Sequence, residues 1–175
     1  MSRLKAVLWD MDGTLVDSET IAVAAFRIAM IEAGLPDLPD LHDRVVGRSA
    51  DDLYRWLVAE FGLSMPVVDW EGRKHFHHFR EADRIRAFPA AAGLFRALTA
   101  EGVPQAIVSN SDRLIMDVQL RLADLARPGQ VTVSRNDLRR GKPDPEGYLR
   151  AAWLLGMEPA ECLVVEDSPS GARAG

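Results

Sequence analysis

Two aspartates close a short apolar run near the start of the chain, in the stretch "VLWDMDGT". Side chains two positions apart on an extended segment point to the same side, so the carboxylates of Asp10 and Asp12 are expected to converge. Oxygen ligands of this kind suit a hard cation such as Mg²⁺. Gly13 would let backbone N–H groups approach an anion, and Thr14 adds a hydroxyl. The stretch therefore predicts a metal or phosphate site, with a simple Asp-Gly turn as the alternative.

Three later segments carry polar side chains after apolar runs. Ser109–Ser111 ends the run "QAIV", Lys142 follows the run at Val131 in the stretch "GKPDP", and Glu166 and Asp167 follow "CLVV". Each segment also has an ordinary structural interpretation, as a helix cap, a solvated lysine and acids at a helix N-terminus. Together, acids, hydroxyls and a cation at successive strand ends predict a single site for phosphate and metal.

The apolar runs predict the elements that position these side chains. Short continuous apolar runs are typical of buried strands, and helical patterns separate the later ones. This alternation predicts an α/β fold in which helices cover a parallel sheet, and such sheets bind ligands at the carboxyl ends of their strands. The predicted strands are Ala6–Trp9, Gln105–Ser109, Val131–Val133 and Cys162–Val165. The predicted helices are marked by Leu94 and Leu98, by Leu114, Val118 and Leu122, and by Tyr148, Ala152 and Leu155.

The segment from Ser18 to Ile85 has helical patterns and no convincing strand. It is predicted to form a helical cap over the strand ends, with the cap at residues 17–86 and the core at residues 1–16 and 87–175. Asp17 and Ser18 are expected to cap its first helix and to form part of the hinge between core and cap.

The stretches "DMDGTLVDS", "SNS", "GKPDP" and "VVEDSPSGARAG" together resemble the haloacid dehalogenase-like superfamily of phosphohydrolases. The resemblance is to the branch with a helical cap after the first motif, and it implies a Rossmann-like core. It implies that Asp10 is the nucleophile, that Asp12 is the general acid and base, and that Ser109 and Lys142 are catalytic residues that hold the transferring phosphoryl group.

The resemblance also implies a Mg²⁺ cofactor and a set of binding residues. The metal would be bound by the Asp10 carboxylate, the Asp12 backbone carbonyl and Asp167, with Glu166 close by or reached through water. Gly13 and Thr14 would surround the phosphate, and the Asn110 amide is a further candidate for binding it. Arg48 would contact the distal part of the substrate, or it is simply a solvent-facing arginine.

The predicted function is a Mg²⁺-dependent phosphatase that acts on a small phosphorylated metabolite, such as a sugar phosphate, through an aspartyl-phosphate. The acid at Asp12 favours phosphoryl transfer, because carbon–halogen hydrolases of this superfamily do not use it. A sugar-phosphate mutase is the alternative, but Ala22, Val46 and Ala50 stand where such mutases typically have a histidine and basic residues. A third hypothesis is an inactive chain that binds only a metal or a partner. Family members usually continue after a segment like "GARAG", whereas the given sequence stops at Gly175, so the core is expected to lack its C-terminal part.

Composition limits the partners. A formal net charge of -5 and 27% charged residues indicate no concentrated basic surface, so neither nucleic acid nor a membrane is expected to bind. The single cysteine, Cys162, cannot form an internal disulfide and is expected to be a small core residue. A reducing, cytoplasmic compartment is therefore predicted. The protein is expected to be a monomer or a weak dimer. In "EGRKHFHHF", Glu71, His75 and His78 share a helical face that could bind zinc, although a polar cap face that includes His77 is the favoured interpretation.

Overall fold

A four-stranded parallel sheet forms the centre of the protein in the computed structural model, which describes residues 4–175. The strands lie in the order β5–β4–β1–β6, and Trp9 of β1 is paired with Ile107 of β4 and Val165 of β6. The predicted α/β class is confirmed. The strands are β1 (Ala6–Asp10), β4 (Gln105–Val108), β5 (Val131–Val133) and β6 (Cys162–Val165).

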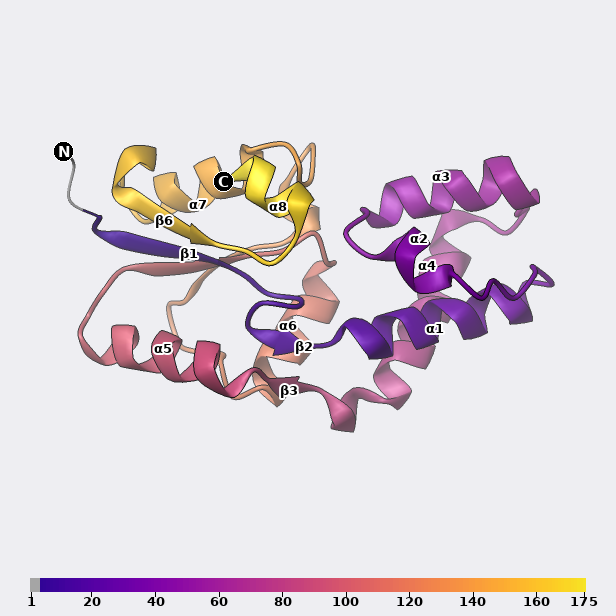
Figure 1. Ribbon diagram of the computed structural model, residues 1–175, viewed down its shortest axis with the longest axis horizontal. Helices are drawn as coiled ribbons and strands as arrows, with labels where there is room; N and C mark the ends of the chain where they lie inside the picture. The colour runs from indigo at the N-terminus through magenta and orange to yellow at the C-terminus, as the bar shows by residue number, and fades with distance from the viewer. Residues whose placement is uncertain (1–3) are drawn as a thin grey trace.

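Helices cover both faces of the sheet (Figure 1). Successive strand side chains point to opposite faces, so neighbouring residues of β1 enter different clusters. Trp9 packs with Phe95 and Met116 on one face, whereas Leu8 packs with Tyr148 and Ala151 on the other. The first face is covered by α5 (Pro89–Ala100) and α6 (Arg113–Leu122), and the second by α7 (Glu146–Leu154) and α8 (Pro169–Ala174).

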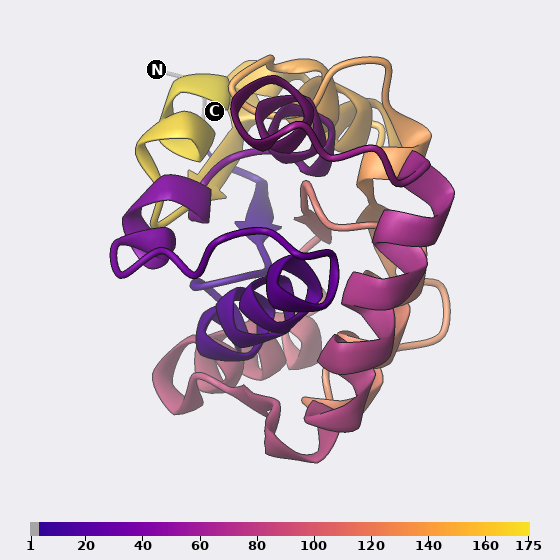
Figure 2. The same ribbon diagram turned by 90° about the vertical axis from the view of Figure 1, so that its right-hand side faces the viewer.

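Four further helices lie beyond the carboxyl ends of the strands (Figures 1 and 2). They have a hydrophobic cluster of their own, in which Phe26 meets Trp70 edge to face at 5.2 Å between ring centroids. We call them the cap helices, and the boundaries proposed for the cap at residues 17 and 86 stay a prediction. They are α1 (Glu19–Glu32), α2 (Leu41–Val45), α3 (Ala50–Phe61) and α4 (Val67–Arg80).

Two short strands flank the cap helices in sequence and were not predicted. Val16–Asp17 (β2) pairs antiparallel with Arg86–Ala87 (β3), so the chain enters and leaves the cap helices side by side. Each strand has two residues, which is too short for an alternating pattern to be visible in the sequence. The remaining elements are single 3₁₀ turns at η1 (Ala82–Arg84), η2 (Arg135–Asp137) and η3 (Pro159–Glu161).

The helix predicted from Leu114, Val118 and Leu122 is present as α6, but two of these residues do not lie on its buried face. Leu114 and Leu122 of α6 are 55% and 46% exposed. The buried residues are instead Ile115, Met116, Gln119 and Leu120. The helix carries two overlapping apolar stripes, and the one that packs against the sheet includes a polar residue, Gln119.

Within residues 4–175, no helix combines the length and the apolar character needed to cross a membrane.

Candidate active site

A cleft of about 230 Å³ lies between the strand ends and the cap helices. The loops after β1, β4 and β6 open into it, because the carboxyl ends of parallel strands meet at one edge of the sheet. Its sheet side is lined by Asp10, Asp12, Asn110, Ser111, Lys142 and Asp167. Residues from separate predicted strand ends thus share one cleft.

Lys142 is the central cation of the cleft and is only 8% exposed. Its Nζ donates to carboxylate oxygens of Asp10 and Glu166 and to the carbonyl oxygen of Val108, the last at 3.0 Å. The carboxamide of Asn110 holds the backbone of Lys142 on both sides. Asn110 Oδ1 accepts from the Lys142 N–H at 2.9 Å, and Asn110 Nδ2 donates to the Lys142 carbonyl at 3.3 Å.

The two carboxylate oxygens of Asp10 lie in different surroundings. Its Oδ1 accepts from Lys142, whereas its buried Oδ2 has no hydrogen-bond partner among the residues that the structure describes. Burial raises the pKa of the Asp10 carboxyl to about 7, against the opposing charge of Lys142. An unsatisfied buried carboxylate oxygen is costly unless a metal or substrate completes the site, so Oδ2 is the atom available to a ligand.

Glu166 is held in its ionised form. Burial by itself would raise its pKa, but the charge and hydrogen bond of Lys142 and the hydroxyl of Tyr148 keep the pKa below its ordinary value. Tyr148 donates to Oε1 at 2.7 Å, and Ser168 donates to Oε2 through its backbone N–H at 3.2 Å and its hydroxyl at 3.0 Å. Glu166 therefore contributes a fixed negative charge beside Lys142.

Three carboxylates in the cleft fit a hard cation. Asp10, Glu166 and Asp167 each offer an oxygen, and these oxygens all lie within 4.8 Å of one another. Thr14 Oγ1 donates to Asp167 Oδ1 at 3.0 Å, which orients that carboxylate. Gly13 has a φ of +86°, and a Cβ at this position would lie 2.3 Å from Asp167 Oδ2. An all-oxygen donor set of this kind suits a hard cation such as Mg²⁺.

Asp12 is held by three serine hydroxyls. Ser18 donates to Oδ1 at 2.6 Å, and Ser109 and Ser111 donate to Oδ2 at 2.9 and 2.8 Å. Ser18 is the N-cap residue of α1, as predicted, but its side chain makes no cap hydrogen bond there. The hydroxyl is used by Asp12 instead. Ser109, predicted to hold phosphate, also contacts Asp12 in this arrangement.

Arg48 lines the cleft but folds back onto the cap helices. Its guanidinium donates to the carbonyl oxygens of Arg44 and Asp52, both at 3.3 Å, and lies 5.4 Å from the ring centroid of Trp56. The substrate contact expected of Arg48 therefore stays a prediction.

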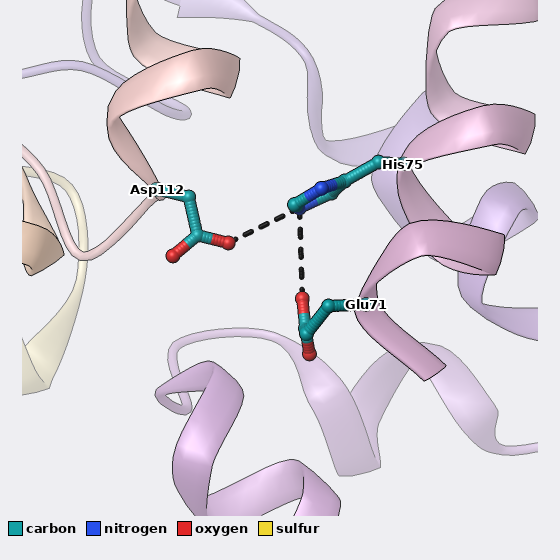
Figure 3. Close-up of side chains that lie close together, drawn as sticks. All are labelled: Glu71, His75 and Asp112. Carbon is teal, nitrogen blue, oxygen red and sulfur yellow. Dashed lines mark hydrogen bonds and ion pairs between the residues drawn. The ribbon is translucent and has the colours of Figure 1, made fainter. Parts of the chain in front are cut away.

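The histidines of α4 separate into different environments. His75 Nε2 lies 3.1 Å from Asp112 Oδ2 and 3.5 Å from Glu71 Oε2 (Figure 3), whereas His78 contacts Gln119. The zinc set of Glu71, His75 and His78 is thus not brought together. The His75 contact instead joins a cap helix to the residue that precedes α6.

Comparison with known proteins identifies the family. The family model of the haloacid dehalogenase-like hydrolases matches residues 4–175. The chain belongs to the haloacid dehalogenase-like hydrolase family. This haloacid dehalogenase-like hydrolase is 33% identical over 173 residues to hexitol phosphatase A of Escherichia coli K12, covering 99% of this chain and 79% of that protein. It is 30% identical over 179 residues to 6-phosphogluconate phosphatase of the same organism, and this match covers 100% of this chain and 79% of that protein.

A solved structure agrees with these relatives. The haloacid dehalogenase-like hydrolase matches a HAD family hydrolase from Deinococcus radiodurans, solved with bound phosphate and sodium, with a TM-score of 0.71 and 33% identity. The match covers 99% of this chain and 77% of that one. The family and the phosphatase relatives support the predicted enzyme class, a phosphoric monoester hydrolase.

Proposed function

We propose that this hydrolase is a Mg²⁺-dependent phosphatase that cleaves small phosphorylated metabolites through an aspartyl-phosphate. The observation that carries the proposal is the buried Oδ2 of Asp10, which has no partner among the described residues and lies on a carboxylate whose other oxygen is held by Lys142. A carboxylate oxygen fixed in this way can act as a nucleophile.

In the first half of the reaction, Asp10 Oδ2 attacks phosphorus and the bond from phosphorus to the ester oxygen breaks. The protonated carboxyl of Asp12 gives its proton to the leaving alkoxide, and the alcohol departs. The Asp12 carboxylate then takes a proton from water as that water attacks phosphorus. The bond between Asp10 and phosphorus breaks, and inorganic phosphate and the Asp10 carboxylate are regenerated.

Lys142 would neutralise charge on the transferring phosphoryl oxygens, and Ser109 would donate to them when it releases Asp12. Gly13 and Thr14 would complete the phosphate surroundings. The carboxylates of Asp10 and Asp167 would hold Mg²⁺, with Glu166 nearby and the Asp12 carbonyl as a further ligand. The metal would supply positive charge that stabilises the transferring group.

A sugar, polyol or sugar-acid phosphate is the proposed substrate class. The phosphatase relatives include one named for hexitol phosphates and one named for 6-phosphogluconate. Ala22, Val46 and Ala50 all line the cleft, so the positions where mutases of this branch carry histidine or basic residues offer no proton-transferring or cationic group. This favours hydrolysis over the mutase alternative. A cytoplasmic monomer or weak dimer remains part of the proposal.

A panel of phosphate monoesters tests the function. Phosphate release is expected from sugar and polyol phosphates with added Mg²⁺, and it should be lost with EDTA and in Asp10→Asn. Activity that survives both changes would refute the mechanism. Interconversion of sugar-phosphate isomers that outpaces phosphate release would favour the mutase instead.

A further inference from the structure

One buried polar side chain of the cleft has no part in the proposed reaction. Gln119 of α6 is 1% exposed and lines the same cleft as Asp10. Its Nε2 lies 3.3 Å from His78 Nε2 of α4, and its Oε1 has no hydrogen-bond partner among the described residues. A buried amide oxygen without a partner is costly, so a ligand that donates a hydrogen bond there would be favoured.

A second buried glutamine shows what a purely structural role looks like. Gln105 is 8% exposed, and its Oε1 accepts from Trp9 Nε1 at 2.8 Å. Its Nε2 donates to the Phe95 carbonyl at 3.1 Å and to Thr99 Oγ1 at 3.0 Å. Both ends of that carboxamide are satisfied by the fold, whereas one end of Gln119 is not. Gln119 is therefore the glutamine left ready for a ligand.

The groups around Gln119 favour an uncharged ligand. Burial lowers the pKa of His78, which keeps its imidazole neutral near pH 7. The nearby ammonium of Lys74 on α4 is already paired with Glu71 at 2.5 Å, and the imidazole of His75 contacts Asp112. Among the residues that line the cleft around Gln119, the described chain offers no unpaired cation for a second phosphate, whereas a hydroxyl group needs only a neutral donor and acceptor.

Gln119 does not belong to the residues proposed to hold the phosphate and the metal. It lies on α6 and contacts His78 of α4, so this part of the cleft is shared by a core helix and a cap helix. Ile115 and Phe26 also line the cleft and offer apolar surface for carbon–hydrogen groups. A ligand whose phosphate lies at Asp10 and Lys142 would therefore contact Gln119 through another part of its structure.

We propose that Gln119, together with His78, binds a distal hydroxyl group of a polyhydroxylated phosphate monoester. The proposal rests on the phosphatase function and names the side chains that recognise the part of the substrate remote from the reaction. Gln119 Oε1 accepts the hydroxyl proton, and the neutral imidazole of His78 is the second polar group within reach. An ester without distal hydroxyl groups makes neither contact.

The test compares two substrates in each variant. The kcat/KM for sorbitol 6-phosphate is divided by that for p-nitrophenyl phosphate, which has no distal hydroxyl groups, so the ratio does not depend on the folded fraction. In Gln119→Leu this ratio should fall about 3- to 10-fold, as expected for one lost hydrogen bond to a neutral group. The fall should come mainly from a higher KM for sorbitol 6-phosphate.

Gln105→Leu is the matched control, because it removes a buried carboxamide outside the cleft; its ratio should equal that of the wild type even if its stability falls. If that variant does not fold, Arg121→Leu on the exposed side of α6 replaces it. An unchanged ratio in Gln119→Leu would overturn the inference. If the wild type cleaves neither ester, the phosphatase proposal fails. Calorimetric titration with sorbitol 6-phosphate then tests Gln119 separately. Weaker binding in Gln119→Leu than in the wild type supports the inference about Gln119, and equal binding overturns it.

Discussion

Gly13 and Asp167 are so close that a single added methyl group at residue 13 would lie 2.3 Å from the Oδ2 of Asp167. They come from the loops after β1 and β6, which are neighbouring strands of the sheet. The backbone of Gly13 also has a φ of +86°, where residues with a Cβ are strained. Residue 13 is therefore a glycine both because of its conformation and because of a neighbouring carboxylate.

Gly13→Ala is expected to lower Mg²⁺ affinity and kcat/KM about 10- to 100-fold, the usual cost of disturbing a group that supports a metal site. Calorimetric titration with Mg²⁺ and phosphate release measure both effects. Gly34→Ala is the matched control: Gly34 has a φ of +75°, but no atom lies within 4 Å of a Cβ placed there. Both substitutions should cost about 1 kcal/mol of stability through backbone strain, so equal activity in the two variants would contradict the displacement of Asp167.

Ser111→Ala should lower kcat about 10-fold with little change in KM, because Asp12 loses one of the hydroxyls that orient it. Steady-state kinetics on a sugar phosphate measure the effect. Ser134→Ala is the control, since the buried Ser134 hydroxyl also donates to a carboxylate, that of Asp137, at 2.8 Å, but does not line the cleft. Its stability should fall while kcat stays unchanged. A rise in KM alone for Ser111→Ala would mean that Ser111 binds substrate rather than orienting Asp12.

The sheet and the set of groups at its edge could be predicted from the sequence. The strands at Val131–Val133 and Cys162–Val165 have the predicted bounds, because both runs are short and rich in β-branched residues, which is typical of strands. Parallel strands present their carboxyl ends at one edge, so Asp10, Lys142 and Asp167 could be expected to converge before any geometry was known.

Contacts that depend on side-chain direction could not be predicted in this way. From the sequence alone, the Ser18 hydroxyl could cap a helix or bind Asp12, and the structure shows the contact with Asp12. Gln119 did leave a sign in the sequence, a polar residue within the stripe that Ile115 and Leu120 share. That pattern does not show what Gln119 faces, because His78 is 41 residues away in the chain.

Asn110→Ala distinguishes two roles for this residue. The carboxamide holds the N–H and the carbonyl of Lys142, so its loss should misplace the lysine and lower kcat about 10-fold with a smaller change in KM. Direct phosphate binding by Asn110 would instead raise KM. Gln130→Ala is the control, because the Gln130 carboxamide donates to the carbonyl oxygens of Gln105 and Val131, at 3.0 and 3.2 Å, but does not line the cleft. It should leave kcat and KM unchanged.

The affinity for Mg²⁺ should rise with pH between 6 and 8. Burial raises the pKa of Asp10 to about 7, so below that pH a proton occupies the carboxyl that would bind the metal, and above it the carboxylate is ionised. For one competing proton with this pKa, the ionised fraction and hence the affinity should be about tenfold lower at pH 6 than at pH 8. Calorimetric titration at the two pH values measures the difference.

Two variants serve as controls. Asp167→Asn should weaken Mg²⁺ binding at both pH values and keep the tenfold ratio of affinities between pH 8 and pH 6. Asp10→Asn should remove that ratio, because its amide does not titrate. An affinity in the wild type that does not change between pH 6 and 8 would show that Asp10 is already ionised at pH 6 or is not a ligand.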